Sequence, residues 1–234
     1  HDDGDVVITA PLTRQLDRAK EQVRFEQLRR YFSPAVVEHI LGHGAEALDQ
    51  PRIVDGTVLF ADLVGYTAMS ERLSADPTRL LYLLNRWLDE GAGACVAHKG
   101  TLDKFIGDAI MVIFGAPFHF PHEELAAVKC ALQMVEAVRG IVTEAGEPMD
   151  ITVGINSGPM LAGSVGSRRR LEYTVLGDTV NVAARLQGSA VPGQILCGPT
   201  TRARLEGSVR FADATEYTLK NRGPVLAYSV LGLV

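Results

Sequence analysis

Two stretches of the chain decide its fold: VLFADLVGYT at residues 58–67 and DKFIGDAIMVIF at residues 103–114. The first is an apolar strand whose polar end leads into a helix. The second belongs to two strands, at 101–106 and 109–114, which are separated only by a Gly-Asp pair. So short a connection between two apolar runs is typical of a tight β-hairpin.

Further elements are expected on both sides of this hairpin. Apolar residues at helical spacing predict a long helix at 77–98 and a second one at 122–142. Downstream we expect strands at 150–156 and 160–165 that turn at Ser-Gly-Pro, a short helix at 179–187, and short strands ending at 225–231. The order strand, helix, strand, strand, helix, strand predicts an α/β (α+β) fold, with a ferredoxin-like βαββαβ core and additional C-terminal strands and short helices.

The composition fits one folded domain with an extension. The 234 residues are 47% hydrophobic and 22% charged, with a formal net charge of −5. The acidic excess argues against a nucleic-acid partner, and no run of 18 apolar residues predicts a membrane span in this fragment. Three scattered cysteines and no signal peptide predict a cytoplasmic protein with reduced thiols.

The chain begins with His1, which suggests a piece of a longer protein. Residues 1–49 are interpreted as an N-terminal extension with linker helices from a missing upstream domain, and residues 50–234 as the main domain.

Two carboxylates are expected to meet at one edge of the sheet. In a βαββαβ sheet the first and third strands are antiparallel neighbours, so Asp62, which ends the first, should lie beside Asp108, which opens the third. Like charges that close are unfavourable unless a cation neutralises them. Oxygen ligands suit Mg²⁺ or Mn²⁺, with phosphates completing the shell. The glycine that follows, Gly65, lies at a helix start, where backbone N–H groups bind phosphate.

Four motifs, FADLVGYT, KFIGD, VGINSG and YTVLGDTVNVAARL, resemble a class III nucleotidyl cyclase catalytic domain over about residues 50–232. The resemblance implies a head-to-tail homodimer with active sites shared between the chains. It also implies that Asp62, Asp108 and the backbone carbonyl of Leu63 bind two divalent cations. The backbone amides that it assigns to phosphate are those of Gly65, Tyr66 and Thr67.

The resemblance also implies how the purine is read. Lys104, four residues before the second metal aspartate, and Thr174 would contact adenine. Asn181 is similar to the ribose-orienting asparagine of the family, Arg185 to its transition-state arginine, and Lys220 to a phosphate-contacting lysine. Threonine at position 174 resembles a IIIb subset, some members of which respond to bicarbonate.

The residue chemistry favours ATP. Lysine only donates, so it pairs with adenine N1 and opposes the protonated N1 of guanine. A threonine hydroxyl accepts from the adenine amino group but can also donate, so it discriminates less well than an aspartate.

The predicted function is an adenylate cyclase that converts ATP to 3′,5′-cyclic AMP and pyrophosphate by two-metal-ion catalysis with Mg²⁺ or Mn²⁺. The expected partners are ATP, a second copy of the chain, and an upstream sensor domain. The alternatives are a relaxed, GTP-accepting cyclase and a catalytically silent domain that binds nucleotide and signals by dimerisation. A diguanylate-cyclase-like domain is disfavoured, because no GGDEF segment stands at the hairpin tip.

Overall fold

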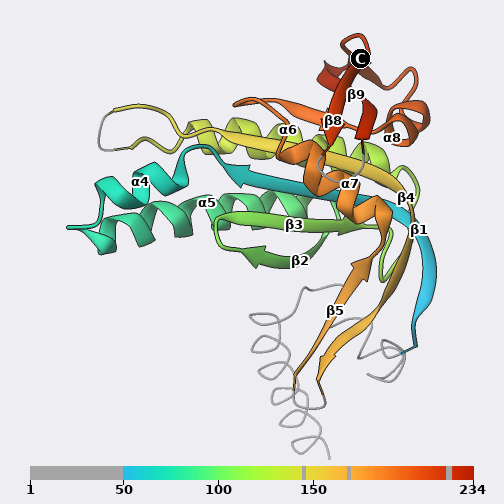
Figure 1. The fold of residues 1–234 in the computed structure, drawn as a ribbon, viewed down its shortest axis with the longest axis horizontal. Helices are drawn as coiled ribbons and strands as arrows, with labels where there is room; N and C mark the ends of the chain where they lie inside the picture. Colours follow the sequence, from blue (N-terminus) through green and yellow to red (C-terminus); the bar gives the residue numbers. More distant parts are fainter. Residues whose placement is uncertain (1–49, 144–145, 168–169, 220–222) are drawn as a thin grey trace, which may run out of the picture.

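The computed structural model describes residues 50–143, 146–167, 170–219 and 223–234 (Figure 1). The predicted extension at 1–49 and Lys220 lie outside these residues. The strands are β1 (Arg52–Leu63), β2 (Thr101–Ile106), β3 (Ala109–Phe114), β4 (Ile151–Ser167), β5 (Arg170–Leu176), β6 (Ile195–Cys197), β7 (Val209–Phe211), β8 (Thr215–Leu219) and β9 (Gly223–Leu233). The helices are α4 (Tyr66–Arg72), α5 (Pro77–Ala97), α6 (Glu123–Arg139), α7 (Asp178–Gln187) and α8 (Pro199–Arg204).

The strands form one mixed sheet in the order β2-β3-β1-β4-β6-β9-β7, with β5 paired to β4 and β8 paired to β9. Strand β1 is antiparallel to both β3 and β4, whereas β4 and β6 are parallel. The first four strands of this order are those of a ferredoxin-like core, and two helical segments connect them as predicted. The predicted fold class is therefore confirmed.

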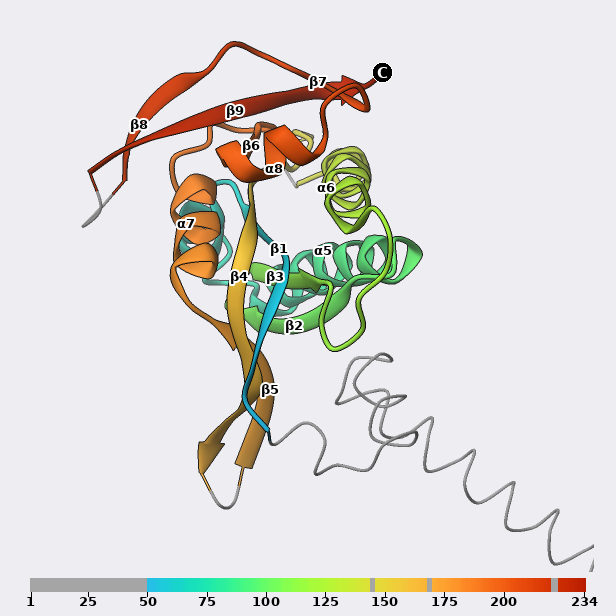
Figure 2. The same ribbon diagram turned by 90° about the vertical axis from the view of Figure 1, so that its right-hand side faces the viewer.

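Helices cover both faces of the central strands, which explains why β1 is apolar on both sides. Helices α5 and α6 lie on one face and α7 lies on the other (Figure 2). Leu59 packs in the cluster that contains Trp87, while its neighbour Phe60 packs in the cluster that contains Ala183 of α7. Successive residues of a strand point to opposite faces, so a strand buried on both faces has no polar alternation.

The two strands predicted at 150–156 and 160–165 are one continuous strand, and this prediction is wrong. β4 pairs with β1 over its first twelve residues, from Ile151 to Ala162, so the Ser-Gly-Pro segment does not turn the chain. On its other edge, the β6 pairing ends at Ile155 and the β5 pairing begins at Leu161. No strand of the described part occupies the interval that contains Pro159, and a residue without a backbone N–H is tolerated there.

One helix boundary differs from the prediction, and one strand was not predicted. Helix α6 spans Glu123–Arg139 instead of continuing to residue 142. Gly140 ends it, and the chain then reverses, because the N–H of Met149 donates to the carbonyl of Ile141. The strand β5 was not predicted; it returns along β4 and builds a two-stranded arm that projects from the body of the domain (Figure 2).

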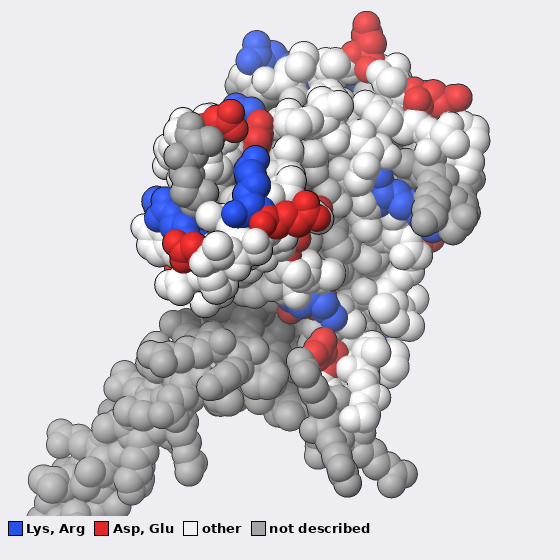
Figure 3. Space-filling view, turned by 60° about the vertical axis from the view of Figure 1, so that its left-hand side comes forward, with Lys and Arg blue, Asp and Glu red and all other residues white. Residues whose placement is uncertain are grey.

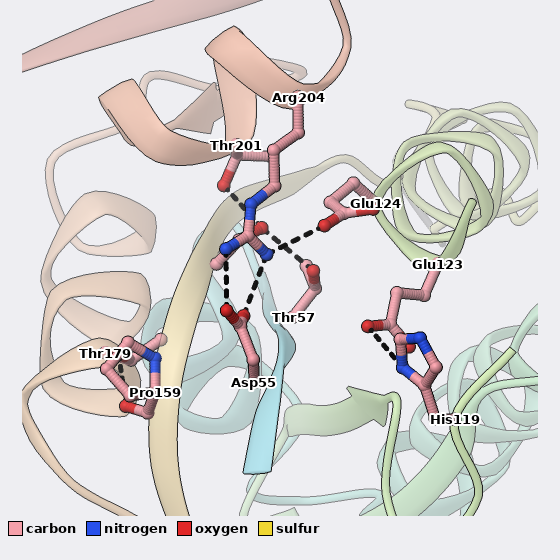
Figure 4. A network of polar contacts seen from close by, with 10 residues as sticks. Asp55, Thr57, His119, Glu123, Glu124, Pro159, Thr179, Thr201 and Arg204 are labelled. Carbon is pink, nitrogen blue, oxygen red and sulfur yellow. Dashed lines mark hydrogen bonds and ion pairs between the residues drawn. The ribbon is translucent and has the colours of Figure 1, made fainter. Parts of the chain in front are cut away.

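A polar network holds α8 against the start of β1 (Figure 4). The guanidinium of Arg204 donates to both carboxylate oxygens of Asp55 at 2.8 Å and to Glu124 at 2.9 Å. This hydrogen bonding lowers the pKa of Asp55, in spite of some burial. The network therefore links α8, β1 and α6 at the start of β1, the end of that strand opposite to Asp62.

Candidate active site

The structure brings Asp62 and Asp108 together at the end of the central strands. Strands β1 and β3 pair up to Ala61 and Ile110, and the same register continued by one step sets Asp62 opposite Ala109, the residue next to Asp108. Burial, the charge of Asp108 and a hydrogen bond with Asp108 together raise the pKa of Asp62 to about 6, against the lowering effects of hydrogen bonds from the Leu63 backbone and Gln187. The predicted juxtaposition of the two carboxylates is therefore present in a single chain.

Hydrogen bonds from α5 and α7 support the segments that carry Asp108 and Asp62. The indole N–H of the fully buried Trp87, on α5, donates to the backbone carbonyl of Asp108 at 2.8 Å. On the other side, Gln187 at the end of α7 donates to Thr152 at 2.7 Å and also hydrogen-bonds the Asp62 carboxylate. Both supports restrict where the carboxylates can move.

The donor set fits a hard divalent cation. Asp108 raises the pKa of Asp62, and the repulsion between these two half-buried carboxylates is relieved when a cation lies between them. All available ligands are oxygens, which suits Mg²⁺ or Mn²⁺ better than softer metals. No group of three or more His, Cys, Asp or Glu in the described ranges could hold a metal, so substrate oxygens and Leu63 would have to complete the shell.

The segment after Asp62 turns sharply into α4. Gly65 is the N-cap of that helix, with φ 71° in the left-handed region, and no atom of the described structure lies where a β-carbon would be. That conformation favours glycine. Tyr66 packs against the core while Thr67 is exposed, and the first N–H groups of α4 have no acceptor within the helix.

Lys104 and Thr174 also meet, although 70 residues separate them in the sequence. Asp103 lies between them: Thr174 Oγ1 donates to Asp103 Oδ2 at 2.9 Å, and Lys104 Nζ lies 3.7 Å from the same oxygen. Lys104 Nζ also contacts Glu172 Oε2 at 3.3 Å. The side chain of Asp103 is fully buried, and burial raises its pKa to about 6, against the lowering effects of Lys104 and Thr174.

A β-bulge explains why the neighbouring side chains of Asp103 and Lys104 both lie beside β5, which carries Thr174 and Glu172. Successive residues of a regular strand point to opposite faces. The register of β2 against β3 shifts between Leu102 and Lys104, which leaves Asp103 without an opposing residue. The extra residue turns the strand locally, so both side chains reach the region occupied by Thr174.

Asn181 and Arg185 lie one turn apart on α7 and therefore share a face. Asn181 is exposed and Arg185 is half-buried. The helix lies very close to β4, because a β-carbon at Gly154 would collide with the backbone oxygen of Ala183 and the backbone nitrogen of Gln187. Glycine in the VGINSG motif thus sets the depth at which α7 packs.

Apart from Lys220 and the residues predicted to act through their backbone, the predicted residues fall into three groups: the pair Asp62 and Asp108, the pair Lys104 and Thr174, and the α7 pair. Within the described ranges, no hydrogen bond or ion pair joins Asn181 or Arg185 to either of the other groups. The residues missed by sequence reasoning are Asp103, Glu172, Gln187 and Trp87. Only Asp103 had a usable signal, because it forms with Lys104 a charged pair between Leu102 and Phe105 of a predicted strand.

The surface around this end of the molecule is mixed in charge. Lys and Arg side chains lie singly or beside Asp and Glu, with uncharged surface between them (Figure 3). In the part of the chain that the structure describes, no helix is both long and apolar enough to cross a membrane.

The chain belongs to the adenylate and guanylate cyclase catalytic domain family, whose model matches residues 48–232. This confirms the resemblance recognised in the sequence. The site therefore lies in a cyclase domain, a class of lyase.

The relatives and neighbours include both kinds of cyclase. Adenylate cyclase 1 of Rhizobium meliloti is 32% identical over 185 residues, covering 76% of this chain and 28% of its own length. The guanylyl cyclase Cya2 superposes with a TM-score of 0.73 at 31% identity, covering 80% of this chain and 95% of its own. The adenylyl cyclase CyaB of P. aeruginosa has a TM-score of 0.72, also at 31% identity, covering 78% and 96%. The chain spans 28% to 47% of the length of the adenylate cyclases that it matches.

Proposed function

We propose that this domain is an adenylate cyclase, which converts ATP to 3′,5′-cyclic AMP and pyrophosphate at a site formed by two copies of the chain. The observation that carries the proposal is the contact between Asp62 and Asp108. Two crowded carboxylates at a sheet edge favour divalent cations that also bind a triphosphate. The family match supports cyclase chemistry in general.

The reaction needs little covalent participation from the protein. The 3′-hydroxyl oxygen of ATP bonds to the α-phosphorus, the bond from that phosphorus to the pyrophosphate oxygen breaks, and the hydroxyl proton is released. Two divalent cations, when bound, would increase the acidity of the hydroxyl and stabilise the triphosphate charge. Asp62, Asp108 and the Leu63 carbonyl would hold them, and the amides at 65–67 would orient the phosphates.

The α7 pair would act on the reacting sugar and phosphate. Arg185 stays protonated and donates in a planar fork, which suits the charge that develops on the phosphorus oxygens. Asn181, on the same face of the helix, would hold the ribose in position for attack.

The preference for ATP rests on Lys104 and Thr174. The ammonium of Lys104 would donate to adenine N1, a position that carries a proton in guanine. Thr174 is only 5% exposed, and the more exposed Lys104 and Glu172 side chains lie beside it. A purine would therefore reach Thr174 only where the Lys104–Glu172 ion pair opens.

A second copy of the chain would supply Arg185, which among the described residues makes no hydrogen bond or ion pair with Asp62 or Asp108 of its own chain. The β2 end and the β4–β5 arm present apolar side chains to solvent, as an interface does before association. These residues are Phe105, Ile106, Leu161, Val165, Leu171 and Leu176. A cytoplasmic location, an upstream sensor and a response to bicarbonate stay predictions.

Product analysis tests the proposal. The chain is incubated with ATP or GTP and Mg²⁺ or Mn²⁺, and both cyclic nucleotides and pyrophosphate are quantified. We expect cyclic AMP in excess, none from Asp62→Ala, and normal activity from Asp89→Ala, which removes an exposed carboxylate on α5. Cyclic GMP in excess would favour a guanylate cyclase instead, an alternative that the similarity to Cya2 keeps open. Nucleotide binding without product would favour the silent domain.

A further inference from the structure

We infer that Asp103 is a specificity-determining positioning residue, which turns the Thr174 hydroxyl into an acceptor-only group and so makes this site favour a 6-aminopurine. The inference rests on the proposed function and names a residue that acts through Thr174.

The contact between the two side chains fixes the direction of the hydroxyl proton. Thr174 Oγ1 lies 2.9 Å from Asp103 Oδ2. An ionised carboxylate can only accept, so the single proton of the hydroxyl lies on this bond. Thr174 Oγ1 can then form further hydrogen bonds only through its lone pairs, that is, as an acceptor from a ligand. Threonine then offers the purine what an aspartate would offer, without placing a charge there.

This direction decides between the two purines. Adenine carries an amino donor at position 6, and guanine carries a keto acceptor at the same place. An oxygen that can only accept forms a hydrogen bond with the amino group of adenine. The same oxygen is repelled by the keto oxygen of guanine, because both atoms are acceptors. A threonine without a partner would rotate and donate to the keto oxygen, so it would accept either purine.

The surroundings of Asp103 hold its carboxylate in position for the contact with Thr174. Its side chain is fully buried on the bulge of β2, and Lys104 Nζ and Thr174 Oγ1 both lie at the Oδ2 oxygen. The other oxygen, Oδ1, has no hydrogen-bond partner among the described residues. A buried carboxylate whose donors lie at one oxygen keeps a single orientation, and burying its unpartnered oxygen is unfavourable for folding.

The test compares selectivity, the ratio of kcat/KM for ATP to kcat/KM for GTP, in the full chain. Asp103→Ala removes the acceptor and should lower this ratio about tenfold, the effect of exchanging one hydrogen bond for a mismatch. Asp103→Asn should keep the ratio within about threefold, because its amide oxygen takes the place beside the two donors and still accepts from Thr174. The asparagine variant is nearly isosteric and remains informative if the alanine variant does not fold.

A double-mutant cycle separates positioning from a structural role. In Thr174→Val there is no hydroxyl to orient, so adding Asp103→Ala should leave the ratio unchanged. Glu172→Gln removes the other carboxylate beside Lys104 and should not lower the ratio. A ratio that stays at the wild-type value in Asp103→Ala would overturn the inference. So would a fall that persists with valine at 174, or one that is equally large in Asp103→Asn, which would assign the effect to charge on Lys104. If the wild-type chain forms no cyclic AMP, the proposed function itself fails, which is a distinct outcome.

Discussion

Replacing Asp108 by asparagine should stabilise the metal-free protein while it abolishes activity. The pKa of Asp62 is raised from 3.8 to about 6. Ionising Asp62 therefore costs free energy in the folded chain that it does not cost in the unfolded chain. Burial is the largest cause and Asp108 the second. Repulsion between two partly solvated carboxylates is on the order of 1 kcal/mol after solvent screening, which is the stabilisation expected from Asp108→Asn.

The pH dependence has a definite sign. Because the folded pKa of Asp62 lies above the unfolded value, its stabilising contribution is complete below about pH 4 and is lost as pH rises through about 6. With a chelator at pH 7.5, Asp108→Asn should therefore melt about 2–4 °C above the wild type, and at pH 4 the difference should vanish.

Thermal unfolding by calorimetry measures these differences, with Asp89→Asn as the control for loss of one exposed charge. Adding Mn²⁺ should raise the melting temperature of the wild type more than that of Asp108→Asn. A variant that melts below the wild type in chelator at pH 7.5 would refute the reasoning, as would an equal Mn²⁺ effect in both proteins.

Three further substitutions test how the scaffold supports the site. Trp87→Phe removes the hydrogen bond to the Asp108 carbonyl and should lower kcat about tenfold at unchanged fold, as judged by circular dichroism and steady-state kinetics. Gly154→Ala places a β-carbon against the backbone of α7 and should destabilise the fold by about 2 kcal/mol or more in urea unfolding. Arg204→Ala should cost about 1 kcal/mol at pH 7, and less at low pH as Asp55, whose pKa is lowered, becomes protonated; unfolding curves measured across pH test this sign.

Much of the central sheet could be predicted because its signals are local. The apolar strands flanking a Gly-Asp turn predicted β2 and β3 at their observed bounds. The antiparallel pairing of the first and third strands then placed Asp62 beside Asp108, since sheet topology alone decides which strand ends meet.

The parts that could not be predicted depend on tertiary pairing. A Gly-Pro step is normally a turn, but at Pro159 the unpaired edge of β4 tolerates it within a strand. The bulge at Asp103 appears only in the register of β2 against β3, and the regular alternation of a strand would have set Asp103 and Lys104 on opposite faces. The support of Asp108 by Trp87 joins residues 21 apart and has no sequence pattern.

The central claim is that two copies of the chain share one active site, and mixing two inactive variants tests it most directly. Asp62→Ala lacks a metal ligand and Arg185→Ala lacks the group proposed to stabilise the reacting phosphate. In a twofold dimer, each mixed pair contains one site with both defects and one with neither, so an equal mixture should recover about a quarter of wild-type cyclic AMP formation. A mixture that stays as inactive as each variant alone, in protein shown to exchange subunits, would contradict the account.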